Sequence, residues 1–470
     1  MATKQEIALM AHLLRRAGFG ATRDEIERRA DDGYDATVEW LLNPDERPEV
    51  DEYLLYRYHP DSERPPKVNH ASVNWLYRMV NTERPLEEKI GLFWHQVFAT
   101  GDNKVESAYE IKEQIAMFRE HGFGNYRDLL VRLAQNPTML YWLDNQENHK
   151  RAPNENWGRE LMELFSMGIG NYTEKDVFEA SRAFTGWAFD TKIHWLLWGP
   201  HLWNYEFHPE DHDGAEKDYL GHTGNFDGFD VIDIIVRQPA CHVFIARHLY
   251  NFFVADEPQV PAWPIEPPRN PEAIRTICES FVKNDYEIKP VLRTIFTSDF
   301  FKDSMYKHVM NPAEVVAGTL RVTGALSEPH PDWEEVALEP MFMGQSLHDP
   351  PSVEGWHTGH EWINSGALVR RVNFMADKFS DTSLPGVQYI IRRVAASNGT
   401  AMKADDLIDH CLDLMGPLSV KDKTRQELIE YVDGEGGSVS WQSPEDFANA
   451  SRVTGRVLAL IAGTREYQFG

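Results

Sequence analysis

Two glutamates one helical turn apart are the residues of this sequence best placed for carboxyl chemistry. They are Glu160 and Glu163 in the stretch PNENWGRELMELF, residues 153–165. If a helix begins near residues 154–156, both side chains share one face with Asn156, because residues three and four apart are neighbours on a helix. Paired carboxylates that point inward can hold a metal ion or transfer protons. The alternative is a surface helix whose glutamates lie in water.

The same helix carries a second charged pair. Glu155 and Arg159 are four residues apart, and this spacing predicts an ion pair along the helix. Such a pair is either a solvated structural contact or, if the helix borders a pocket, part of a ligand-binding face. We therefore take Asn156 and Arg159 as candidate ligand-binding residues.

A histidine in FWHQVF, residues 93–98, is expected to be buried. His95 is flanked by Phe93, Trp94, Val97 and Phe98, so a helix that carries it is apolar nearly all round. A histidine in such a setting is commonly a core residue with its hydrogen bonds satisfied. A neutral imidazole that faces two inward carboxylates would instead be a metal ligand or a general base.

A loop rich in histidine and aspartate, FHPEDHDGAEKDYLGH at residues 207–222, offers further polar groups. It includes His212, Asp213 and Lys217. The spacing of His208 and His212 matches no HExxH signature, and Pro209 argues against a continuous helix through the loop. Loops of this composition either close over a pocket or form a polar network that holds the fold together.

A third loop, GQSLHDPPSVEGWHTGHEWINSG at residues 344–366, is rich in glycine, histidine and tryptophan. Trp356 is a candidate platform for a flat substrate such as a sugar or an aromatic ring. The alternative is a packed loop whose tryptophans fill the edge of the core.

The elements that must position these residues are predicted to be helices. Segments such as EEKIGLFWHQVFA and CHVFIARHLYNFFV repeat apolar residues three and four apart, and alternating patterns typical of strands are scarce. Capping boxes are indicated at Thr22, Thr173 and Ser443, and a capped start with proline at Asn311. We expect a mainly α, large multi-helical domain over 1–470 with long ordered loops and little β structure. A boundary between sub-lobes is expected in the proline-rich stretch 255–271.

Composition limits the classes of partner. The chain of 470 residues has 47 Lys and Arg against 74 Asp and Glu, a formal net charge of −27, which argues against nucleic acid. Apolar residues make up 42% of the chain, so it is expected to fold. The three cysteines show no metal or disulfide spacing. No apolar stretch is long enough for a membrane span, and the N-terminus lacks the pattern of a signal peptide, so a cytoplasmic location is expected.

Several blocks resemble the bacterial family of unknown function DUF1800. They are HLLRRAGFG, FWHQVF, PTMLYWLDN, APNENWGRELMELFSMG, YTEKDVFEASRAFTGWAF, HDGAEKDYLG, IARHLYNFFV, NPAEVVAGTLR and GQSLHDPPSVEGWHTGHEWINS…RRVNF, and they cover essentially the whole chain in order. The resemblance implies a single folded unit but no established activity. It adds Trp187, in the TGW block, to the candidate ligand-binding residues.

The chain departs from the family pattern at two places. Family members typically read WHNHF where this chain has WHQVF, and ELHTLG where it has ELFSMG, so two imidazoles are absent here. Members commonly carry export signals, which are not seen here. Many are encoded beside a secreted, alkaline-phosphatase-like family, and this implies a phosphatase-like protein partner.

The first functional hypothesis is a metal-assisted enzyme, a hydrolase or an oxidoreductase. His95, Glu160, Glu163 and His212 would bind a divalent transition metal (Zn, Fe or Mn), and Glu160, Glu163, His95 and Asp213 would be the catalytic groups. Asn156, Arg159, Trp187, Lys217 and Trp356 would contact the substrate, a small molecule or a saccharide. The second hypothesis is a metal-free carbohydrate-active enzyme. The third is a non-catalytic binding partner of the phosphatase-like protein, in which the polar residues form buried structural networks.

Overall fold

The computed structural model describes residues 2–59, 70–192, 202–397 and 401–470. In these residues the chain is mainly helical, and its strands form three two-stranded antiparallel sheets. The prediction of a mainly α fold with little β structure is therefore confirmed. None of the helices that the structure describes is both long and apolar enough to cross a bilayer.

The N-terminal third consists of helices, and one of them is buried almost throughout. Its elements are α1 (Lys4–Arg16), α2 (Arg23–Asp32), α3 (Tyr34–Leu42), η1 (Pro44–Glu46), α4 (Leu55–Tyr58), α5 (His70–Asn81), α6 (Pro85–Val97), α7 (Asp102–Val105), α8 (Ala108–His121), α9 (Tyr126–Gln135), α10 (Pro137–Trp142) and η2 (Asn145–Glu147). The helix that carries FWHQVF, α6, is buried almost throughout. Its burial confirms the expectation drawn from its continuous apolar surface.

The middle of the chain combines helices with two hairpins. Its elements are α11 (Asn156–Glu163), α12 (Glu174–Ala183), β1 (Trp187–Lys192), β2 (Leu202–Phe207), η3 (Pro209–Asp211), β3 (Lys217–Tyr219), β4 (His222–Gly224), α13 (Gly228–Val236), α14 (Pro239–Phe253), η4 (Val260–Ala262), α15 (Pro271–Lys283), α16 (Ile288–Thr297) and α17 (Asp299–Lys302). Strands β1 and β2 pair from Trp187 with Phe207 to Lys192 with Leu202. Helices α14 and α15, on either side of the proline-rich stretch, pack against each other.

The C-terminal part is again helical. Its elements are α18 (Pro312–Thr323), α19 (Trp333–Val336), α20 (Glu339–Phe342), η5 (Gly359–Ile363), α21 (Ser365–Ser380), α22 (Pro385–Ser397), β5 (Ala401–Lys403), α23 (Ala404–Leu414), α24 (Asp422–Gly434), β6 (Ser438–Ser440), α25 (Pro444–Ala462) and α26 (Arg465–Gln468). The segment between α20 and η5 is a long irregular connection, as the loop prediction expected.

The four helix starts predicted from local capping signals are all correct. Thr173 and Ser443 form the predicted capping boxes at the starts of α12 and α25, and Asn311 caps α18 in the same way with Glu314. Thr22 precedes α2, but its side chain makes no capping hydrogen bond, so the capping box predicted there is absent. The boundary was right although the capping contact was not formed.

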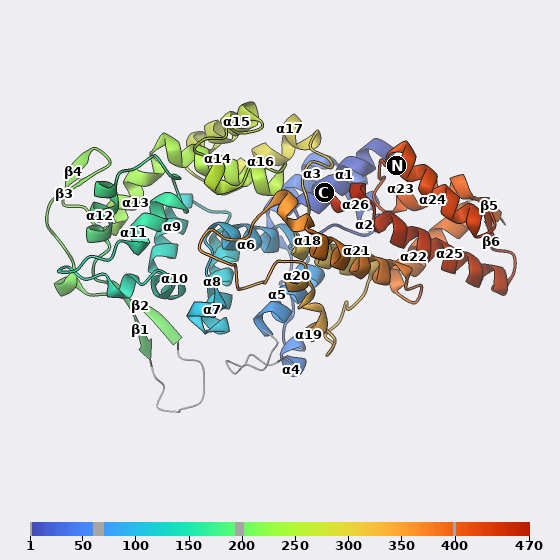
Figure 1. Cartoon of the computed structure of the whole chain (residues 1–470), viewed down its shortest axis with the longest axis horizontal. Coiled ribbons are helices and arrows are strands. Elements are labelled where there is room, and N and C mark those ends of the chain that lie inside the picture. Colours follow the sequence, from blue (N-terminus) through green and yellow to red (C-terminus); the bar gives the residue numbers. More distant parts are fainter. Residues whose placement is uncertain (1, 60–69, 193–201, 398–400) are drawn as a thin grey trace.

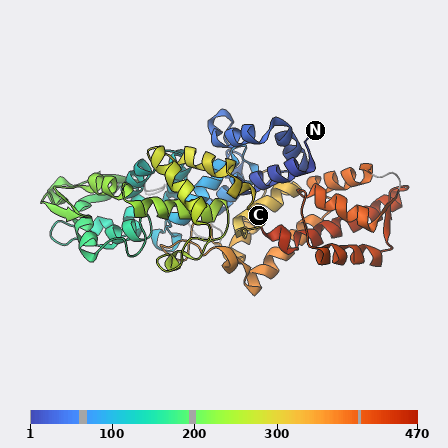
Figure 2. The ribbon, with the colours of Figure 1, turned by 90° about the horizontal axis from the view of Figure 1, so that it is seen from above.

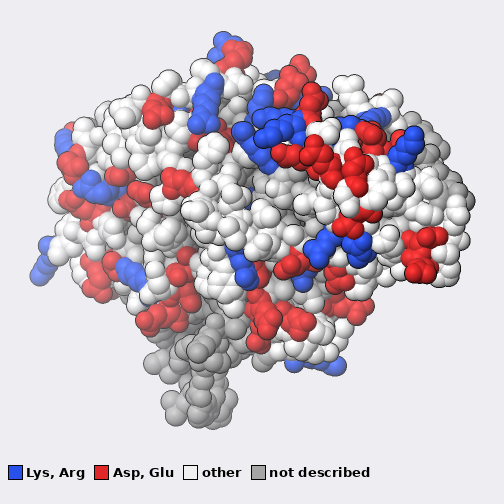
Figure 3. Space-filling view, turned by 45° about the vertical axis from the view of Figure 1, so that its right-hand side comes forward, with Lys and Arg blue, Asp and Glu red and all other residues white. Residues whose placement is uncertain are grey.

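The molecule is elongated along one axis (Figure 1). Helices α11 to α13 and the two hairpins lie at one end, and α22 to α25 lie at the other. The view from above shows the same order, with the C-terminus near the centre beside the N-terminal helices (Figure 2). One connected cluster of buried apolar side chains includes residues from Ile7 to Phe469. On the face shown in Figure 3, acidic and basic side chains are interspersed and are not gathered by sign.

Candidate active site

Helix α11 is amphipathic and leaves its two glutamates on the less buried side. Trp157, Leu161 and Met162 are buried, whereas Glu160 and Glu163 are partly exposed. The helix starts after a turn in which Asn154 Oδ1 accepts the backbone N–H of Asn156 at 3.0 Å. Residues three apart on a helix bring their Cβ atoms to about 5–6 Å, so the two carboxyl groups are neighbours.

The predicted pair of Glu155 and Arg159 forms, but a second glutamate holds Arg159 more tightly. Arg159 Nη2 lies 3.4 Å from Glu155 Oε2 and 2.6 Å from Glu174 Oε2, and Nη1 donates to Glu174 Oε1 at 3.0 Å. This fork joins α11 to the first turn of α12 at the surface. Arg159 is therefore occupied by protein carboxylates.

The two carboxyl groups of α11 differ in their surroundings. Glu163 Oε2 accepts a hydrogen bond of 2.6 Å from the Tyr172 hydroxyl. Burial raises the pKa of Glu160 to about 7, and the charges of Glu163 and Glu354 add to that rise. At neutral pH a carboxyl with this pKa is present in both its protonated and its ionised form. A carboxyl that can both donate and accept a proton at neutral pH suits acid–base chemistry.

A cleft of about 340 Å³ opens beside the end of this helix. Its lining is mostly apolar and comes from four separate segments. It consists of Glu163, Leu164, Met167, Gly168, Ile169, Asn171, Pro239, Ala240, Val243, Phe244, Arg247, Val260, Pro261, Trp263, Pro264 and Glu354. Glu163 is one of the lining residues, and Glu160 lies one helical turn before it on α11. A concave, largely apolar site with a few polar groups is the usual form of a small-molecule site.

Two charged residues of the cleft, Glu354 and Arg247, are absent from the sequence predictions. Glu354 comes from the loop at 344–366, for which the sequence predicts a ligand-binding role only for Trp356. Arg247 lies in the apolar helix α14, and its Nε donates to Glu257 Oε2 at 2.7 Å. An arginine inside such an apolar segment indicates a buried ion pair, so this pair was predictable from the sequence. No comparable sequence pattern predicts that Glu354 lies close to α11.

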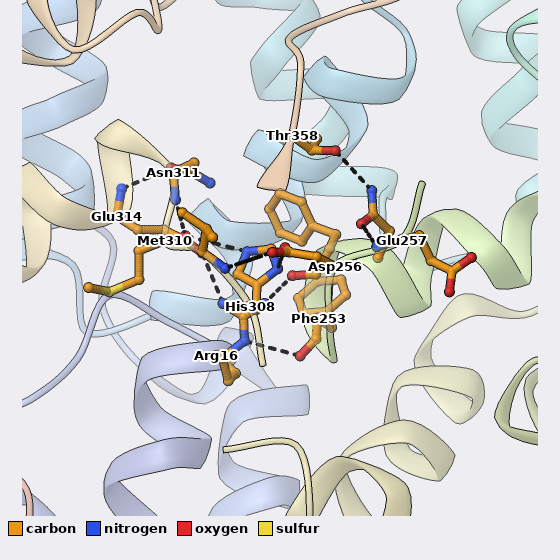
Figure 4. Close-up of polar contacts among 12 residues, drawn as sticks. Arg16, Phe253, Asp256, Glu257, His308, Met310, Asn311, Glu314 and Thr358 are labelled. Atoms are coloured by element: carbon orange, nitrogen blue, oxygen red, sulfur yellow. Dashed lines mark hydrogen bonds and ion pairs between the residues drawn. The ribbon is translucent and has the colours of Figure 1, made fainter. Parts of the chain in front are cut away.

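The proline-rich wall of the cleft is anchored by a buried polar network (Figure 4). Just before the wall, the Asp256 carboxylate lies 2.9 Å from His308 Nδ1 and accepts the Val309 N–H at 3.2 Å. Gln259 Nε2 then donates to the carbonyl oxygen of Thr358 at 2.7 Å. These contacts tie the wall to residues 308–309, which lie just before α18, and to the loop that supplies Glu354. The stretch at 255–271 thus forms part of the cleft.

His95 lies in the core and not beside the carboxylates of α11. Its ring contacts those of Trp75, Trp356 and His348, with centroids 5.6, 5.4 and 6.3 Å away. Burial lowers its pKa to about 3, so the imidazole is neutral. Neither ring nitrogen has a hydrogen-bond partner among the residues that the structure describes. The burial of His95 agrees with its interpretation as a core residue. The hydrogen bonds expected for such a residue are not formed among the described residues.

Trp356, the candidate platform for a flat ligand, is packed against the protein. The side chain is 4% exposed, and its Nε1 donates to the Ser346 carbonyl oxygen at 3.1 Å. The preceding Gly355 lies so close to Gln96 that a Cβ there would sit 2.1 Å from the Gln96 carbonyl oxygen. This part of the loop therefore fills the edge of the core.

The polar loop at 207–222 forms a structural network. Arg182 Nε donates to Asp213 Oδ2 at 2.7 Å, and Lys217 Nζ donates to the Asp213 carbonyl oxygen at 2.6 Å. His212 Nδ1 lies 2.9 Å from the Thr185 carbonyl oxygen. Trp187 is 1% exposed among aromatic rings, so its indole has no surface to offer a ligand. These residues agree with the network alternative for the loop.

The four predicted metal ligands are thus not assembled at one place. Glu160 and Glu163 lie together, whereas the rings of His95 and His212 contact other partners. In the described ranges, no group of three or more His, Cys, Asp or Glu side chains is arranged to hold a metal ion. These residues come from two helices, α6 and α11, and from one loop, and the packing of these three segments gives the imidazoles of His95 and His212 other neighbours.

Comparison with known proteins supplies a family. No curated protein and no solved structure matches the chain. The sequence model of one family, described as a protein of unknown function (DUF1800), matches residues 12–469. The match takes in α11, the cleft and the loop that carries Glu354. The chain belongs to the DUF1800 family.

Proposed function

We propose that this protein is a hydrolase that uses the Glu160 and Glu163 carboxyl groups on a small, largely apolar substrate held in the cleft. The observation that carries the proposal is the position of two adjacent carboxyl groups at the edge of a 340 Å³ apolar cleft. Water and substrate can meet there beside Glu163, with Glu160 one helical turn away. The fixed, proline-rich wall opposite supplies a preformed binding surface.

The two glutamates divide the proton transfers between them. Glu163, held by Tyr172, takes a proton from water, and the water oxygen forms a bond to the electrophilic carbon of the substrate. The bond from that carbon to the leaving group breaks, and Glu160 donates its proton to the leaving group. Transfer of the proton from Glu163 back to Glu160 through solvent restores the starting state. One water is consumed in each cycle.

The lining favours a small apolar substrate over an extended saccharide. Phe244 and Trp263 are the aromatic residues of the cleft among those the structure describes, and aliphatic and proline side chains form the rest of the apolar surface. Carbohydrate sites rely on exposed aromatic faces and many hydrogen-bonding groups. The cleft provides few of either.

The test is a hydrolysis screen on the full-length chain with chromogenic esters, amides, phosphate esters and glycosides. Glu160→Gln and Glu163→Gln each remove one proton-transferring group and keep the shape of the side chain. We expect each variant to lower kcat by about 10²–10³-fold. The control Glu266→Gln changes an exposed glutamate of the proline-rich stretch that does not line the cleft, and it should keep full activity. Unchanged kcat in both α11 variants would overturn the proposal.

A further inference from the structure

The cleft carries an excess of carboxylates. Glu163 and Glu354 line it, and the charges of both raise the pKa of Glu160 one turn away. Arg247 is the single basic residue among the lining residues, in the part of the chain that the structure describes. The charge of Arg247 therefore decides whether the cleft favours a cationic or an anionic ligand.

Arg247 does not cancel that excess, because it is already paired. Its Nε donates to Glu257 Oε2 at 2.7 Å, and the two side chains are 4% and 0% exposed. A pair shielded from water in this way is neutral as a unit. Glu163 and Glu354 have no ion-pair partner among the residues that the structure describes, so the cleft is complementary to a cationic group.

One N–H donor group of Arg247 nevertheless remains available to a ligand. Its Nη1 reaches the Trp263 carbonyl oxygen at 3.4 Å, whereas Nη2 has no hydrogen-bond partner among the described residues. The whole residue is 3% exposed and borders the cleft. A buried donor without an acceptor is destabilising, and an oxygen atom of a ligand would satisfy it.

The rest of the lining is an apolar surface. Val243, Phe244 and Val260 contribute to it together with leucine, methionine, isoleucine and proline side chains. Val243 and Ile169 are 45% and 48% exposed, which is unusual for aliphatic side chains grouped around one cleft. An apolar part of the ligand would cover them.

We propose that the cleft binds an apolar amine that carries a carbonyl oxygen, the class that includes amides and esters of apolar amino acids. Its ammonium group pairs with Glu354, its carbonyl oxygen accepts from Arg247 Nη2, and its apolar side chain covers the aliphatic wall. Binding of this ligand class does not depend on the proposed function, whereas its hydrolysis rests on that function. In turnover the bond between the carbonyl carbon and the amide nitrogen or ester oxygen breaks, the carbon gains the water oxygen, and the leaving group gains a proton.

Three small probes separate the expected contacts. Leucinamide has all three features, N-acetylleucinamide lacks the positive charge, and isopentylamine lacks the carbonyl group. Calorimetric titration of the full-length chain at low salt should show leucinamide binding about tenfold more tightly than either relative, the effect of one lost polar anchor. Equal binding of leucinamide and N-acetylleucinamide would overturn the cationic assignment, and equal binding of isopentylamine would overturn the role of Arg247.

A pair of variants tests the position of the ammonium group. Glu354→Gln, an exposed residue of the cleft, should weaken leucinamide about fivefold and leave N-acetylleucinamide unchanged. The control Glu266→Gln should leave both unchanged. Leucinamide binding in this pattern without hydrolysis would refute the proposed hydrolase and support the ligand class. Hydrolysis of other substrates that depends on Glu160, with no preference for leucinamide, would refute the ligand class alone.

Discussion

Tyr172 donates a hydrogen bond of 2.6 Å to Glu163, the carboxylate one helical turn from Glu160. The tyrosine hydroxyl holds the Glu163 carboxyl at a fixed position in the lining of the cleft. Burial and the neighbouring charge of Glu163 shift Glu160 toward its protonated form. In the proposed hydrolase, Glu160 is therefore the acid of the pair and Glu163 the base.

The first prediction concerns stability and pH. The pKa of Glu160 is raised from 4.5 to about 7 on folding, so the folded state binds more protons than the unfolded state between these values. Its contribution is therefore present below about pH 4.5 and is lost as the pH rises to 7. Glu160→Gln should match the wild type in free energy of unfolding at pH 4.5 to 5. It should exceed the wild type by about 1–2 kcal/mol at pH 8, a value discounted for the solvent-exposed part of the side chain.

Denaturant unfolding at the two pH values measures this difference. A difference between the two proteins that is the same at pH 5 and pH 8 would mean that Glu160 titrates normally. Glu266→Gln, which removes an exposed glutamate, serves as the control for the loss of one carboxylate.

The second prediction concerns the hydroxyl of Tyr172. Tyr172→Phe removes the hydrogen bond that holds the Glu163 carboxyl in position. We expect kcat/KM at neutral pH to fall by about tenfold, because the base is then less well oriented toward the attacking water. The kcat/KM of Tyr53→Phe, a change at an exposed tyrosine, should equal that of the wild type. Equal kcat/KM values for Tyr172→Phe and the wild type would contradict the role of Glu163 as base.

The third prediction concerns the buried imidazole of His95. His95→Leu replaces a ring whose two nitrogens lack partners among the described residues with an apolar side chain of similar volume. The free energy of unfolding should rise by about 1 kcal/mol, since unsatisfied buried polar groups are lost. His95→Ala should lower it by about 2–4 kcal/mol through the cavity it leaves. If His95→Leu were instead destabilised by as much as His95→Ala, the ring would have a polar partner.

The fourth prediction concerns the loop at 207–222. Asp213→Ala removes the acceptor of Arg182 Nε in a partly buried pair. We expect a loss of about 1–3 kcal/mol in stability, because Arg182 Nε is left without its acceptor while Nη1 keeps its contact with Glu179. The kcat of the folded variant should remain that of the wild type. Circular dichroism melting and the hydrolysis assay together test this, and a drop in kcat without a drop in Tm would return Asp213 to the catalytic candidates.

Features that depend on neighbouring residues were predictable from the sequence. Helix starts at Thr173, Asn311 and Ser443 follow from capping patterns only a few residues long. The shared side of Glu160 and Glu163 follows from the helical repeat. The burial of α6 follows from its continuous apolar surface. Each of these depends on backbone geometry within one or two turns, which the local sequence determines.

The assembly of the cleft depended on tertiary packing. Glu354 reaches α11 and Arg247 borders the same space because four segments far apart in sequence pack around it. The same packing directs His95 toward Trp75 and Trp356, and His212 toward the Thr185 carbonyl oxygen. Sequence by itself determined which residues carry carboxyl and imidazole groups and which helices present them. Only the packing of those helices and loops decided which groups meet, because contacts between distant segments are set by how buried surfaces fit together.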